Sequence, residues 1–177
     1  MAVRNIDRRQ LLSRVAVLAV ALSAARALAR PSDGESPLAF VSAIYRRAVK
    51  EGAGNFVWSE AADRPRFMTK SLVALFAKTD AATLEGDEGP GGFDYVTDTN
   101  GLTIASFKAA LERQEGPKAV VAVTLGYKEK DVSRKKPVVL RYDLVVEDGQ
   151  WKVDDIREED WALRKLLTDF VVTQKKE

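Results

Sequence analysis

The stretch Val138–Arg157, VVLRYDLVVEDGQWKVDDIR, constrains the fold more than any other part of the chain. At its centre, Asp148-Gly149 is a two-residue turn signal, because both central residues of a type I′ turn need a positive φ. Apolar residues alternate with polar ones on both sides of this turn, which is the period of a strand with one buried face. The stretch therefore predicts a half-buried β-hairpin.

The turn also predicts which residues of the hairpin share a face. Counting outwards pairs three sets of residues on the buried face: Val146 with Trp151, Leu144 with Val153, and Tyr142 with Asp155. The other face carries a charged set that we expect in solvent: Arg141, Asp143, Lys152 and Asp154. One carboxylate, Asp155, thus falls on the buried face, and a one-residue β-bulge would exchange it with Asp154.

The N-terminal segment Met1–Ala29 is typical of an export signal. It has a basic start, an apolar run over Val15–Ala25 and a small-x-small cleavage site at Ala27-Leu28-Ala29. The apolar run is short for a membrane span, which argues against an anchor. Asp7-Arg8-Arg9-Gln10-Leu11-Leu12 resembles a twin-arginine signal, and the general secretory route stays open. We expect a soluble periplasmic protein made of Arg30–Glu177.

Removal of the signal changes the charge of the protein. The whole chain has 28 Lys and Arg against 26 Asp and Glu, and the signal holds five of the basic residues and one acid. The remaining 148 residues carry 23 basic and 25 acidic side chains, a net charge of −2. This balance gives no support to nucleic-acid binding. The length suits a single domain, which must rely on its core because there is no cysteine.

Periodicity and punctuation predict the remaining elements. We expect the fold class α+β, with helices segregated from an antiparallel sheet in one domain. A first helix should be capped by Ser36 and ended by Gly52, and a second should start after Thr69, following an irregular stretch. The expected elements, in order, are helix Pro37–Glu51, a helix ending near Leu84, loop Gly86–Gly101, strands Thr103–Arg113 and Lys118–Tyr127, the hairpin, and helix Glu158–Phe170.

The order of these pieces resembles a known family. A helix-helix-sheet chain whose last strand reads G-x-W-K-V-D-D-I is similar to the nuclear-transport-factor-2-like cone, and more closely to the exported bacterial family called domain of unknown function 3828. The matching pieces are Phe40-Val41, Ile44-Tyr45, Ser71-Leu72, Leu75-Phe76, Phe93-Asp94-Tyr95, Asp98, Tyr142-Asp143-Leu144, Gly149–Ile156 and Leu163–Leu167. The resemblance implies a curved sheet wrapped around helices, with a pocket, in an exported protein. It implies no particular activity.

The residue types present limit the chemistry. There is no His and no Cys, so the usual general base, a thiolate nucleophile and most transition-metal sites are excluded. The glycines of the loop lack a following Gly-Lys-Ser/Thr, and its acids do not fit a calcium loop. We therefore expect no cofactor, no metal and no assigned catalytic residue.

The candidate ligand-binding residues are those expected around the pocket: Tyr45, Asp94, Asp98, Tyr142 and Asp155. A buried Asp155 beside Tyr142 would have a raised pKa, suited to proton transfer. The alternative is that Asp155 pairs with a helix arginine or accepts backbone N–H bonds. Likewise, the aspartates of the loop either select a ligand or cap turns. Trp151 is expected in the core.

Several functions fit these residues. The favoured one is a non-catalytic module that binds a small molecule or an envelope partner, as a monomer or weak dimer. The alternatives are an isomerase, dehydratase or hydrolase that uses carboxylate and Tyr, and an immunity-type inhibitor. An unpaired Asp155 in a deep cavity would favour catalysis, and a filled cavity would favour a structural or partner role.

Overall fold

The fold is seen in a computed structural model, which describes residues 34–52, 60–84, 89–129 and 136–174. The predicted signal Met1–Ala29 therefore lies outside the described residues. The elements in order are α1 (Pro37–Glu51), α2 (Arg64–Phe67), α3 (Lys70–Ala82), β1 (Ile104–Glu115), β2 (Lys118–Tyr127), β3 (Val139–Glu147), β4 (Gln150–Arg157) and α4 (Leu163–Gln174). Within these ranges no helix is both long and apolar enough to cross a membrane.

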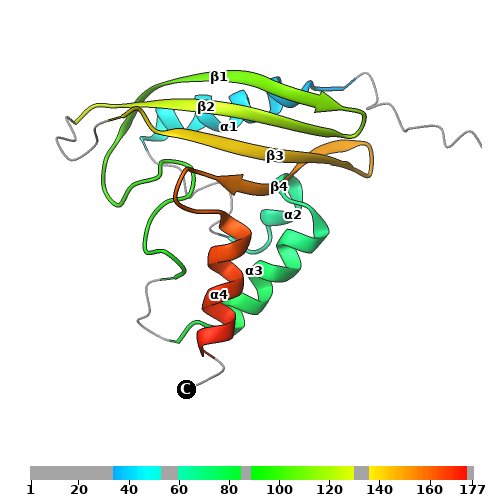
Figure 1. The fold of residues 1–177 in the computed structure, drawn as a ribbon, viewed down its shortest axis with the longest axis vertical. Helices are drawn as coiled ribbons and strands as arrows, with labels where there is room; N and C mark the ends of the chain where they lie inside the picture. Colours follow the sequence, from blue (N-terminus) through cyan, green and yellow to red (C-terminus); the bar gives the residue numbers. More distant parts are fainter. Residues whose placement is uncertain (1–33, 53–59, 85–88, 130–135, 175–177) are drawn as a thin grey trace, which may run out of the picture.

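The four strands form one antiparallel sheet in the order β1-β2-β3-β4. The sheet is curved but does not close, as in a cone-like fold, and α1 crosses behind β1 and β2 (Figure 1). Helices α3 and α4 pack side by side below β4 (Figure 1). The predicted α+β class, with a C-terminal helix, is confirmed. The core lies between the sheet and these helices, and Trp151, 5% exposed, belongs to it as expected.

Two helices begin at the residues that the sequence indicates. The Ser36 hydroxyl accepts a hydrogen bond from the Ala39 N–H at 3.1 Å, and α1 ends at Gly52 with φ of 74°. The Thr69 hydroxyl accepts one from the Leu72 N–H at 3.3 Å at the start of α3. These caps satisfy N–H groups that have no partner inside the helix.

The hairpin turn forms as predicted, but its register changes at a bulge. Asp148 and Gly149 have φ of 51° and 76°, as a type I′ turn requires. Val146 pairs with Trp151 and Leu144 with Val153, as expected. Beyond them the register shifts, so Asp143 pairs with Asp155 and Tyr142 with Ile156. The expected pairing of Tyr142 with Asp155 is wrong, because Asp154 is an extra residue in β4.

The predicted charged face is only partly correct. Arg141 and Asp143 form ion pairs across the sheet, with Glu112 and Arg157 respectively. Lys152 is not in solvent: it is 8% exposed, and its ammonium donates to the carbonyls of Pro65 and Arg66 at 2.9 and 2.8 Å. Burial lowers the pKa of Lys152. The sequence does not predict this contact, because both carbonyls belong to α2, a short helix in a stretch that was expected to be irregular.

Asp154 also leaves the predicted solvated face, because Arg164 of α4 holds it. The Arg164 guanidinium donates to the Asp154 carboxylate at 2.5 Å, to the Asp154 carbonyl at 2.6 Å and to the Ser71 hydroxyl at 2.7 Å. The Thr69 hydroxyl donates to the same carboxylate at 3.0 Å. This network joins the bulge of β4 to the start of α3 and to α4.

The final helix starts later than predicted. It begins at Leu163 and not at Glu158, and it extends to Gln174. The intervening residues form a turn, closed by a hydrogen bond of 2.9 Å from the Glu158 N–H to the Trp161 carbonyl. The polar, acidic start of this segment therefore belongs to a turn and not to the helix.

We predict that Arg164→Met lowers the free energy of unfolding by about 1–2 kcal/mol, because it removes several charge-assisted hydrogen bonds at once. The matched control is Lys165→Met on the same helix, which removes only an exposed ion pair to Asp169 and should cost about 0.5 kcal/mol or less. Urea denaturation of both variants measures the difference. Equal losses of unfolding free energy in the two variants would show that the Arg164 network stabilises the fold no more than an exposed ion pair does.

Candidate functional site

Two of the five candidate residues, Tyr45 of α1 and Tyr142 of β3, meet in the core. Both are 0% exposed, and their hydroxyl oxygens are 2.9 Å apart. The Tyr45 hydroxyl also donates to the Val96 carbonyl at 2.9 Å. Since a phenol has one hydrogen, Tyr142 must donate to Tyr45. This chain of hydrogen bonds ties the sheet, α1 and the 89–103 segment together.

The two buried phenols are poor acids. Burial raises the pKa of Tyr45 well above its usual value, and burial likewise raises the pKa of Tyr142. Neither phenolate forms at ordinary pH. The pair is therefore a fixed neutral hydrogen-bonded unit and not a base.

Asp94 shapes the 89–103 segment. Its carboxylate accepts the N–H groups of Val96 and Thr97 at 2.8 and 3.2 Å, and its own carbonyl accepts the Asp98 N–H at 2.7 Å. The Asp94 N–H donates to the Thr99 carbonyl at 3.1 Å, which closes the turn. These bonds are the turn-capping role that the sequence left open for this aspartate.

Asp98, Tyr95 and Tyr127 make further hydrogen bonds that fix the same segment. Asp98 has a positive φ of 51°, and its carboxylate accepts the Trp161 indole N–H at 2.7 Å. The hydroxyl of Tyr127 donates to the Thr97 carbonyl and that of Tyr95 to the Pro90 carbonyl, both at 2.6 Å. Burial raises the pKa of Tyr95 to about 12.

Asp155 lies elsewhere, beside the first turn of α4. Its carboxylate accepts the N–H groups of Ile156 and Arg164, at 2.9 and 3.0 Å. Ile156 takes the place beside Tyr142 that the predicted register gave to Asp155. Asp155 is half-buried, and burial raises its pKa. The alternative that it accepts backbone N–H bonds is confirmed, and the five candidates do not form one constellation.

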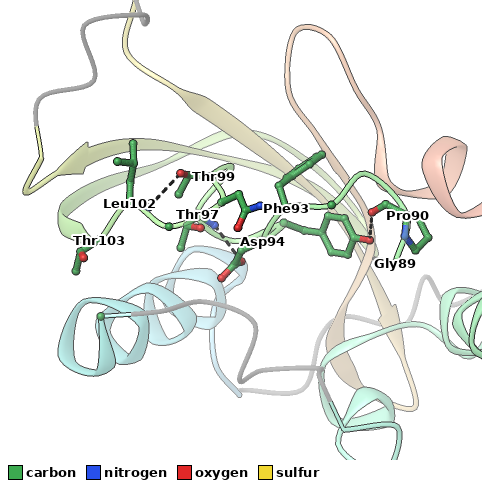
Figure 2. A pocket seen from close by; sticks show the side chains of 13 residues that line it. Gly89, Pro90, Phe93, Asp94, Thr97, Thr99, Leu102 and Thr103 are labelled. Atoms are coloured by element: carbon green, nitrogen blue, oxygen red, sulfur yellow. Dashed lines mark hydrogen bonds between the residues drawn. The ribbon is translucent and has the colours of Figure 1, made fainter. Parts of the chain in front are cut away.

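The structure does contain a hollow of about 550 Å³ next to Asp94 (Figure 2). It lies where the 89–103 segment passes the C-terminal end of α1, and Asp94 is the one candidate residue that lines it. The lining is Gly52, Gly89, Pro90, Gly92, Phe93, Asp94, Tyr95, Thr97, Thr99, Asn100, Gly101, Leu102 and Thr103. The side chains labelled in Figure 2 include Thr97, Thr99 and Thr103, which carry hydroxyl groups, and the aromatic Phe93.

Most of the polar residues of this hollow are absent from the sequence-based candidates. Thr97, Thr99 and Asn100 fall within the predicted loop, where their side chains resemble ordinary turn residues. Only the density of Gly, Asp, Asn and Thr in that loop hinted at a site. Among the described residues no group of His, Cys, Asp or Glu could hold a metal ion. The arrangement suits hydrogen bonding to a neutral polar molecule better than proton transfer.

We predict that Tyr45→Phe costs more stability than Tyr142→Phe. The first leaves both the Tyr142 hydroxyl and the Val96 carbonyl without their partner, about 1–3 kcal/mol, whereas the second removes one bond and should cost about 1 kcal/mol. The double variant should cost less than the sum, because both remove the same bond. Urea denaturation of all three variants tests this order, which would be contradicted if Tyr142→Phe were the costlier change.

We predict that Asp155 makes the protein less stable as pH rises. Its folded pKa lies above the ordinary 3.8, so the unfolded chain releases this proton first and ionisation favours unfolding. Relative to Asp155→Asn, the wild type should lose stability as pH rises from below 3.8 through the folded pKa. Urea midpoints from about pH 3 to about pH 7 measure this difference. A difference that grows in favour of the wild type would contradict it.

Comparison of the chain with protein-family models, with curated proteins and with solved structures found no match. The function of the hollow therefore has to be inferred from its own residues.

Proposed function

We propose that this protein is an exported, non-catalytic binding module, and that it binds a small polar molecule in the hollow of the 89–103 segment. The proposal includes the predicted signal Met1–Ala29 and the resemblance to the exported domain of unknown function 3828 family within the nuclear-transport-factor-2-like cone. The rest of the proposal depends on contacts within the described residues.

The observation that carries the proposal is that the candidate proton-transfer groups already have structural partners. The carboxylates of Asp94 and Asp155 each accept two backbone N–H bonds, and Asp98 accepts an indole N–H. The buried tyrosines have raised pKa values. Each of these carboxylates thus uses one oxygen to hold the backbone or an indole in place. The two buried phenols do not form a phenolate at ordinary pH, so they do not act as general bases. These structural roles support binding without turnover.

The hollow has the rigidity that a binding site needs. Its walls are held by hydrogen bonds from Tyr45 of α1 to Val96 and from Tyr127 of β2 to Thr97. A third bond, from Tyr95 to Pro90, closes the segment on itself. A site ordered before the ligand arrives loses less entropy on binding. The lining combines the aromatic Phe93 with hydroxyl and amide groups, the usual mixture of small-molecule pockets.

Gly89 allows a sharp test of the hollow. Nothing in the described structure lies within 4 Å of a Cβ built on Gly89, and its φ is not in the left-handed range. Gly89 lines the hollow, so a side chain at this position can be added beside it without backbone strain. Gly89→Trp should fill the site and leave the fold intact. Ala74→Trp, on an exposed position of α3, is the matched control.

We predict that a thermal-shift screen of neutral polar metabolites, sugars and polyols included, finds compounds that raise the Tm of the wild type and of Ala74→Trp. The same compounds should leave the Tm of Gly89→Trp unchanged. At 100 times its Kd a ligand stabilises the fold by about 2.7 kcal/mol, which is easily detected. Chromatography of each ligand after long incubation should show no conversion. A shift that persists in Gly89→Trp, or a converted ligand, would contradict the proposal.

A further inference from the structure

A second cavity lies at the opposite end of α1 from the hollow. It has a volume of about 510 Å³ and opens between the start of α1, the short α2 and the β3–β4 turn. We call it the hairpin crevice; its lining is Gly34, Glu35, Phe40, Arg66, Phe67, Gly149, Gln150 and Trp151. It shares no residue with the hollow. The two cavities lie at opposite ends of α1, which has 15 residues and is about 22 Å long.

Trp151 is the feature of the crevice that points to a ligand. Its side chain lines the crevice and is 5% exposed, yet its indole N–H has no hydrogen-bond partner among the residues that the structure describes. Buried indole N–H groups normally have a partner, as that of Trp161 has in Asp98. An acceptor atom supplied by a bound molecule would satisfy the Trp151 donor.

The walls indicate the rest of the ligand. Phe40 and Phe67 are partly buried aromatic rings, so with Trp151 the crevice has three aromatic surfaces suited to a flat apolar body. Arg66 lies over the Phe67 ring at 5.7 Å, and its side chain is 74% exposed. Its nearest carboxylate, that of Asp63, is 3.7 Å away. An exposed positive charge and a buried N–H donor in the lining of the same crevice favour a carboxylate on the ligand.

We propose that the hairpin crevice binds a small molecule with a flat apolar body and a carboxylate group, which accepts the Trp151 indole N–H and faces Arg66. Glu35 also lines the crevice and opposes an anion there. This site is independent of the one proposed in the hollow.

The probe is 2-naphthoate, with the uncharged 2-naphthamide as its matched comparison. The chain has three tryptophans, so a ¹⁵N-labelled sample gives three indole N–H signals, and Trp151→Phe identifies the one that belongs to Trp151. We expect 2-naphthoate to shift that signal saturably, and 2-naphthamide to bind more weakly. Glu35→Gln should tighten the binding of 2-naphthoate.

Arg66→Gln tests the charge without touching the core, because its side chain is exposed. It should weaken the binding of 2-naphthoate about twofold to fivefold, as expected for the loss of an exposed charge. The affinity for 2-naphthoate should then be close to that for 2-naphthamide. Arg46→Gln, an exposed arginine of α1 outside the crevice, and Gly89→Trp in the hollow should leave binding unchanged. No shift of the Trp151 signal up to about 10 mM 2-naphthoate, where even a millimolar Kd would be nearly saturated, overturns the proposal. The proposal is also overturned if Arg66→Gln and Arg46→Gln change the affinity for 2-naphthoate equally.

Discussion

The hydrogen bonds from Tyr142 to Tyr45 and from Tyr45 to Val96 are the contacts on which the arrangement of the protein depends. They join β3, α1 and the 89–103 segment at one fully buried point. Because unpaired hydroxyls and carbonyls are costly in a core, these three parts of the chain cannot shift independently. The 89–103 segment contains several turns and little regular structure, yet its backbone is fixed by hydrogen bonds from Tyr45, Tyr127 and Asp94. This is how an irregular stretch can form the wall of a binding site.

Four aspartates, Asp94, Asp98, Asp154 and Asp155, have structural roles as hydrogen-bond acceptors. Asp94 and Asp155 each accept two backbone N–H groups, Asp98 accepts an indole N–H, and Asp154 binds the Arg164 guanidinium. In a chain without His or Cys, such carboxylates are the natural candidates for acid–base catalysis. Their structural roles support the proposed binding function. The raised pKa of Asp155 is a consequence of its burial at the start of α4 and needs no catalytic explanation.

Much of the fold was predictable, because caps, turns and periodicity are local signals. Ser36, Gly52, Thr69 and Asp148-Gly149 each act where the sequence indicates. The bulge at Asp154 was an open alternative that the sequence could not decide, since Asp154 and Asp155 have identical side chains and the guanidinium that binds Asp154 comes from Arg164 of α4, outside the hairpin. The burial of Lys152 also depends on a tertiary contact, because its partners are the carbonyls of Pro65 and Arg66 in α2. The five residues were predicted as ligand-binding candidates, with structural roles as the alternative for the aspartates. Their actual grouping depends on tertiary contacts that no local pattern carries.

The two cavities lie at the two ends of α1 and differ in chemistry, one polar and one aromatic. The central claim is that the first is a preformed site, held by Asp94 and the tyrosines before any ligand binds. Amide hydrogen exchange of the ligand-free protein tests this most directly. The N–H groups of Val96, Thr97 and Asp98 should be protected to a degree close to that of the central strands, because each has a partner on Asp94. Exchange of these three amides at the rate of an unstructured peptide would contradict the account.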